Sequence, residues 1–119
     1  ELGPNAIPAS YVLSHNDIHQ IQNTIDEYNS IIQSLAQTYD LAFMDAYSFM
    51  QQLETGFVFD AISFNTDFVS GGSFSLDGVH LSKRGYAVIA NKFLEVINMK
   101  YNAMIPYVNV GDYEGIQFP

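Results

Sequence analysis

Residues 75–90 read SLDGVHLSKRGYAVIA, and this stretch says more about the fold than any other part of the chain. The dipeptide Asp77-Gly78 is typical of a turn, and Ser82 is a favourable N-cap for a following helix. From Lys83 onward, apolar residues recur at steps of three and four, which predicts an amphipathic helix over residues 83–101. The stretch therefore predicts a loop that ends at the N-terminus of a helix.

A second, longer helix is expected over residues 16–39, where apolar residues also recur in steps of three and four. Ser14 is its expected N-cap, and Asp17 lies where a carboxylate complements the helix dipole. In the helix over 83–101, we expect the buried stripe to consist of Tyr86, Ile89, Ala90, Phe93, Leu94 and Ile97.

The segment between these helices begins with a short apolar run, residues 41–44, which we interpret as a buried strand of an α/β unit. Asp45 follows this run. It either lies at the functional edge of a sheet or caps a short helix over residues 46–53, and we favour the cap. Gly56 is expected to end that helix.

Residues 57–76 show no sustained period, and we therefore expect a long structured loop. Its aromatic residues either line an apolar cleft or pin the loop to the body of the protein, and we favour the second interpretation. Near the C-terminal end, residues 107–110 are expected to form one short edge strand.

The composition limits the possible functions. The chain has 119 residues, which suits a single domain, and its hydrophobic content of 48% is sufficient for a packed core. A net charge of −9 disfavours nucleic acid and anionic membranes as partners. The absence of cysteine excludes disulfides, thiolate zinc sites and a cysteine nucleophile. No apolar run approaches the roughly 20 residues that a membrane span requires.

Asp77 and His80 form the constellation with the clearest chemical meaning. A carboxylate that accepts a hydrogen bond from Nδ1–H of an imidazole fixes the ring tautomer and leaves Nε2 free to take a proton from a hydroxyl. His15 and His19 are spaced so that they could share a metal, but no third ligand is evident. We therefore expect exposed histidines there and no metal site.

The segment 76–90 resembles the final sequence block of the SGNH hydrolases, also called GDSL lipases or acylhydrolases, in which Asp-x-x-His precedes a helix. The broader resemblance covers roughly residues 14–101. It implies an α/β fold, a three-layer α/β/α sandwich of the flavodoxin-like type, with His80 as general base and Asp77 as its orienting partner. It also implies an ester substrate, no cofactor, and an exported or cell-envelope protein of a bacterium.

The Gly-Asp-Ser block that carries the nucleophile in that family does not occur in this sequence, nor does the Gly-x-Asn-Asp block. We therefore interpret residues 1–119 as the C-terminal, mostly helical part of one hydrolase domain, inactive alone and prone to self-association as a dimer. The alternative is a non-catalytic module, which binds a ligand or partner through the aromatic segment 57–76 and is monomeric.

Overall fold

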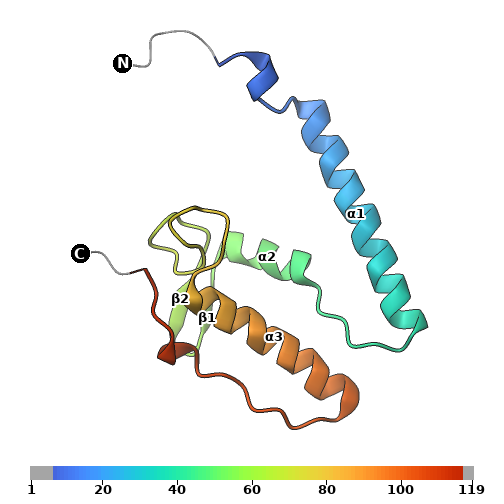
Figure 1. The fold of residues 1–119 in the computed structure, drawn as a ribbon, viewed down its shortest axis with the longest axis vertical. Coiled ribbons are helices and arrows are strands. Elements are labelled where there is room, and N and C mark those ends of the chain that lie inside the picture. Colours follow the sequence, from blue (N-terminus) through green and yellow to red (C-terminus); the bar gives the residue numbers. More distant parts are fainter. Residues whose placement is uncertain (1–6, 117–119) are drawn as a thin grey trace. The chain divides into compact units, whose positions relative to one another are not determined.

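The computed structural model describes residues 7–116, and it divides into one unit that ends at Asp40 and a second that begins at Leu41 (Figure 1). The first unit contains the short 3₁₀ helix η1, Ala9–Tyr11, and the long helix α1, His15–Thr38. The second contains α2, Ala46–Thr55, the strands β1, Phe57–Phe59, and β2, Ile62–Phe64, the helix α3, Lys83–Tyr101, and the 3₁₀ helix η2, Val110–Asp112. The chain thus has both helices and strands, and helices predominate.

The helix N-termini follow the sequence predictions closely. Ser14 caps α1 in a reciprocal capping box, in which its hydroxyl accepts from the Asp17 N–H at 3.2 Å while the Asp17 carboxylate accepts from the Ser14 N–H at 2.9 Å. Asp45 caps α2 by accepting from the Ser48 N–H at 2.9 Å, which confirms the favoured interpretation of this residue. Gly56, with a φ of 76°, ends α2 as expected.

The predicted strand at residues 41–44 is wrong, because this segment has no regular secondary structure and Leu41 is exposed. The Ala42 N–H donates to the Tyr101 hydroxyl at 3.1 Å and not to a neighbouring strand. The predicted strand at 107–110 is also wrong, since residues 107–109 have no regular secondary structure and Val110 begins η2. Apolar composition alone does not make a strand, which needs a partner for its backbone groups.

The predicted long loop over 57–76 instead begins with a β-hairpin. β1 and β2 pair antiparallel, with Phe57 opposite Phe64 and Phe59 opposite Ile62. Both turn residues, Asp60 and Ala61, have positive φ, of 49° and 62°, as a two-residue type I′ turn requires. This turn could not be predicted from the sequence, because it lacks the glycine that is usual in type I′ turns.

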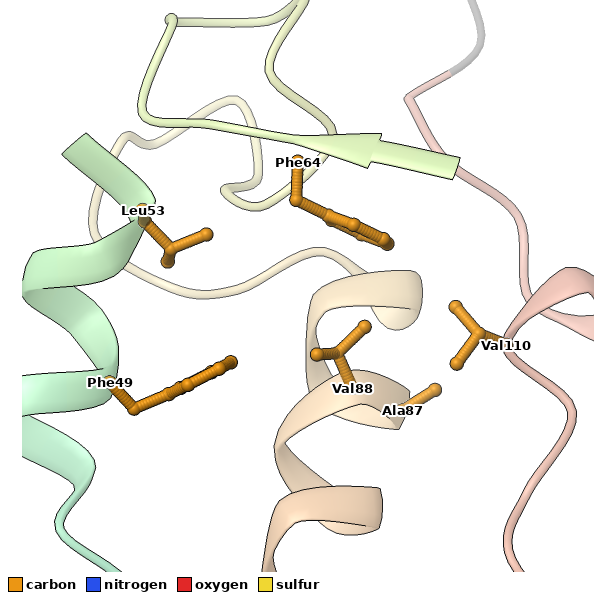
Figure 2. Close-up of a cluster of buried hydrophobic side chains, with 6 residues drawn as sticks. All are labelled: Phe49, Leu53, Phe64, Ala87, Val88 and Val110. Carbon is orange, nitrogen blue, oxygen red and sulfur yellow. The ribbon is translucent and has the colours of Figure 1, made fainter. Parts of the chain in front are cut away.

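The core of the second unit forms where α2, the hairpin, α3 and η2 meet, and the aromatic residues of the hairpin belong to it. Figure 2 shows the side chains from these four elements converging. The Phe57 ring lies 5.4 Å from that of Phe49 and 5.6 Å from that of Phe64, measured between centroids. Most aromatic residues of segment 57–76 therefore pack against the body, as favoured above, but Phe68 is 64% exposed. The buried cluster consists of Phe49, Leu53, Phe64, Ala87, Val88 and Val110.

The buried face of α3 differs from the predicted one. Tyr86 and Phe93, both placed in the buried stripe by the sequence, are 52% and 47% exposed. Ile89, also in the predicted stripe, is partly buried against the core, but the most buried residues of α3 lie outside that stripe. They are Gly85, Ala87, Val88 and Asn91.

Ser82 fastens the first turn of α3 to the segment before it. Its hydroxyl accepts from the Gly85 N–H at 3.0 Å and donates to the Gly72 carbonyl at 2.7 Å, while its own N–H donates to the Ser73 carbonyl at 2.8 Å. The helix comes so close that a Cβ at Gly85 would collide with the Ser73 carbonyl oxygen. The helix cap and the preceding loop are therefore one rigid junction.

The segment after α3 runs back along the helix, held by two asparagine side chains (Figure 1). The Asn91 amide donates to the Val108 carbonyl and accepts from the Val108 N–H, both at 2.8 Å. Asn98 makes the same pair of bonds with Ile105, both at 2.9 Å. Seven helical residues rise about 10.5 Å and three extended residues span about 10 Å, which explains why the two pairs match in register.

Replacing Asn91 by alanine should destabilise the second unit by about 1–3 kcal/mol, because a buried amide is lost and both backbone groups of Val108 are left without partners. Asn98→Ala is the matched control and should cost about 1 kcal/mol or less, since its bonds to Ile105 are exposed and water can replace them. Urea unfolding of the three proteins measures the difference. Equal losses for the two variants would contradict a special role for the buried pair.

Candidate active site

Residues 74–81 form a closed loop directly before α3. Phe74 and Leu81 make an antiparallel bridge at its base, and the Ser75 N–H donates to the His80 carbonyl at 2.7 Å. Inside the loop the Gly78 N–H donates to the Ser75 carbonyl at 3.0 Å. Gly78 has a φ of 69°, a conformation that glycine adopts without strain. The predicted Asp-Gly turn is thus present, and the backbone around it is fixed at both ends.

The Asp77 carboxylate is the centre of this loop. Its Oδ1 atom accepts three hydrogen bonds, from the Val79 N–H at 2.9 Å, the His80 N–H at 2.9 Å and the Ser75 hydroxyl at 2.7 Å. Its Oδ2 atom lies 2.6 Å from Nδ1 of His80. The structure therefore brings Asp77 and His80 into direct side-chain contact, and it adds Ser75, which the sequence analysis did not connect with the pair.

The hydrogen bonds to Asp77 fix its charge. The Ser75 hydroxyl, the His80 ring and the N–H groups of residues 79 and 80 together hold the pKa of Asp77 well below its ordinary value of 3.8. The group is therefore a carboxylate at neutral pH and can only accept. It follows that Nδ1 of His80 donates in the short contact, and that Nε2 of the neutral ring carries the free lone pair.

The ring is also accessible. The His80 side chain is 71% exposed and that of Asp77 is 50% exposed, so the imidazole is not enclosed in the core. Because both groups are near water, the electrostatic strength of the pair is moderate. The loop therefore contributes mainly the orientation of the ring. Nδ1 is held by Asp77, and Nε2 lies on the opposite side of the ring from this contact.

The serine hydroxyls nearest in sequence are directed elsewhere. Ser75 donates to the carboxylate, and both Ser73 and Ser82 donate to backbone carbonyls of the pair 71–72. Among the residues that the structure describes, none of these three hydroxyls is hydrogen-bonded to the His80 ring. Ser73 and Ser75 therefore use their hydroxyls in the local structure of the loop.

An open depression lies beside the loop. It is lined by residues 75–77, 82–83 and 114–116. The Lys83 ammonium and the Glu114 carboxylate lie 3.5 Å apart in an exposed ion pair, and the Arg84 guanidinium donates to the Tyr113 carbonyl at 3.0 Å. The segment after η2 therefore borders the surface next to Asp77.

Other parts of the described chain offer less chemistry. Within residues 7–116, no group of three or more histidine or acidic side chains is arranged to hold a metal ion, and His15 and His19 are both exposed on α1. None of the helices in this range is long and apolar enough to cross a membrane. The loop 74–81 remains the candidate site.

The low pKa of Asp77 predicts acid sensitivity. A carboxyl group whose pKa is lower in the folded than in the unfolded chain stabilises the fold fully above its ordinary value of 3.8. This contribution is lost as the pH falls through the folded-state pKa. Asp77→Asn should therefore flatten the decline of the unfolding free energy between about pH 4 and pH 2, measured by urea unfolding at several pH values. An unchanged slope would contradict this assignment. Asp45→Asn, which removes another carboxylate with a lowered pKa, should flatten it separately.

Comparison with known proteins now adds to this geometry. No curated protein and no solved structure matches the chain significantly. The sequence model of the family described as GDSL-like Lipase/Acylhydrolase matches residues 2–93. The matched range includes the loop 74–81 and the first half of α3, but not the segment after α3 that is bonded to Asn91 and Asn98. Because this match spans most of the chain, the chain belongs to the GDSL-like lipase/acylhydrolase family.

Proposed function

We propose that the chain supplies the aspartate–histidine half of a serine ester hydrolase, with His80 as general base and Asp77 as its orienting partner. The observation that carries this proposal is the 2.6 Å contact between Nδ1 of His80 and Oδ2 of an anionic Asp77. Membership of an acylhydrolase family supports an ester as the substrate class. The accessible ring, which a substrate can approach, supports the same conclusion.

In the proposed reaction, Nε2 of His80 takes the proton of a serine hydroxyl while the serine oxygen bonds to the ester carbonyl carbon. The tetrahedral intermediate then breaks its bond to the alcohol, which leaves with the proton from Nε2. Water attacks the acyl-serine and gives a proton to Nε2. The serine oxygen recovers this proton as the acid departs. Throughout, the Asp77 carboxylate stabilises the imidazolium and holds the ring orientation.

We further propose that the nucleophile and the oxyanion-stabilising groups come from a part of the domain that precedes these 119 residues. The sequence lacks the Gly-Asp-Ser block, and the nearby serine hydroxyls donate to other groups. A two-stranded sheet is also less than a three-layer α/β/α sandwich needs. On this proposal, the missing strands of the sandwich belong to the same preceding part.

A fluorophosphonate probe, which reacts with activated serines, tests the proposal. A protein that includes the preceding part of the gene product should be labelled at one serine within that part, whereas the 119-residue chain alone should not be labelled. His80→Ala in the longer protein should slow labelling on the order of 10⁶-fold, as expected for loss of a triad base. His15→Ala, which replaces a histidine far from the loop in sequence, is the matched control.

Two results would overturn the proposal. One is labelling of the 119-residue chain itself, which would place a nucleophile within it. The other is labelling of the longer protein at an unchanged rate after His80→Ala.

We also propose that the isolated chain self-associates through the apolar stripe of α1, which consists of Ile18, Ile21, Ile25, Tyr28, Ile32 and Leu35. Its side chains are exposed to an unusual degree for large aliphatic residues: Ile21 is 46%, Ile32 53% and Leu35 50% exposed. Contiguous apolar surface of this kind favours association.

Light scattering during size-exclusion chromatography should show a dimer of the 119-residue chain. The double substitution of Ile25 and Ile32 by glutamate should give a monomer, because charges on the stripe oppose burial. Glutamates at Ser30 and Ser34, on the opposite face of α1, add the same charge and should leave the dimer intact. A monomeric wild-type chain at all concentrations would contradict the prediction.

A further inference from the structure

The two oxygens of the Asp77 carboxylate have different surroundings. Oδ2 contacts the His80 ring, whereas Oδ1 accepts from two backbone N–H groups and from the Ser75 hydroxyl. The two backbone donors come from residues 79 and 80, on the C-terminal side of the aspartate. The Ser75 hydroxyl comes from the N-terminal side. Oδ1 therefore accepts hydrogen bonds from residues both before and after Asp77 in the chain.

Ser75 is itself well anchored. Its N–H donates to the His80 carbonyl at 2.7 Å, its carbonyl accepts from the Gly78 N–H at 3.0 Å, and the residue as a whole is half-buried. A hydroxyl on such a residue has few orientations available. Because its acceptor is charged, the 2.7 Å bond is also of the stronger, charge-assisted kind.

This anchoring matters because the pair is exposed. A free carboxylate rotates about its Cβ–Cγ bond and exchanges partners with water, and the Asp77 side chain is 50% exposed. Two backbone donors on Oδ1 restrict the position of that oxygen, but a third donor from another direction restricts the plane of the group. With the plane fixed, Oδ2 stays directed at Nδ1.

We propose that Ser75 is a positioning residue that fixes the plane of the Asp77 carboxylate and thereby holds His80 in the Nδ1–H tautomer. The catalytic consequence rests on the proposed function, but the effect on the tautomer does not. A merely structural role in closing the loop would use the backbone of Ser75, which a side-chain substitution leaves in place.

The test is nitrogen-15 NMR of the His80 ring in the 119-residue chain at about pH 8, where the two ring nitrogens report the proportions of the Nδ1–H and Nε2–H tautomers. The wild-type ring should be mainly Nδ1–H. Ser75→Ala should shift the ring toward Nε2–H, and Ser75→Thr, which keeps the hydroxyl, should restore the wild-type pattern. Ser70→Ala, which removes an exposed hydroxyl five residues away, is the control and should change nothing.

A second readout is the carbon-13 titration of the Asp77 carboxylate, whose midpoint should rise in Ser75→Ala, since a donor to the anion is lost. The proposal is overturned if Ser75→Ala leaves the proportion of the Nδ1–H tautomer unchanged, whatever happens to the midpoint. If Ser75→Ala does not fold, the Ser75→Thr variant provides the test. Retention of the Nδ1–H tautomer in folded Ser75→Thr supports the proposal, and loss of that tautomer overturns it.

In the longer protein, Ser75→Ala should lower kcat about tenfold with little change in KM, since a ring that is less often oriented weakens only the proton-transfer step. Failure of the proposed function is distinguishable from failure of this inference. If His80→Ala had no effect on activity, the hydrolase proposal would fall while the tautomer result would stand. If His80→Ala abolished activity but the Ser75 variants behaved as wild type, the hydrolase proposal would stand and the proposed role of Ser75 would fall.

Discussion

The hydroxyl of Ser82 makes the interaction on which the site depends. It accepts from the Gly85 N–H in the first turn of α3 and donates to the Gly72 carbonyl, so that the start of the helix and the segment leaving the hairpin are joined at one atom. Gly85 permits this joint, because any side chain there would meet the Ser73 carbonyl. The loop 74–81 is thus carried by α3, and its position relative to the core follows from the packing of that helix.

Helix α3 also holds the segment that follows it, through side-chain hydrogen bonds and not through strand pairing. Asn91 and Asn98 offer the backbone of residues 105 and 108 the donor and acceptor that a neighbouring strand would offer. An extended segment can therefore lie along a helix with its polar groups paired, provided that the spacing of the amides matches both geometries. This arrangement leads the chain to η2, whose Val110 completes the core, and onward to the depression beside Asp77.

At the site, one carboxylate links the backbone to the chemistry. Four donors converge on Asp77 and keep it charged, and the charge in turn decides which nitrogen of His80 carries the proton. Since the pair is exposed, its usefulness depends on orientation more than on a low-dielectric environment. The closed loop around it supplies that orientation through short, local hydrogen bonds.

The sequence by itself determined the features that depend on neighbours within three or four residues. The caps at Ser14, Asp45 and Ser82, the extent of α3 and the contact of Asp77 with His80 are all of this kind, because each partner lies within one turn. Only the tertiary structure decided which segments pair and which faces are covered. The apolar run 41–44 found no strand to pair with, the hairpin formed around a turn without glycine, and α3 buried Asn91 while leaving Phe93 exposed. The reason is that pairing and burial are properties of two segments brought together, whereas a cap or a local turn is complete within one.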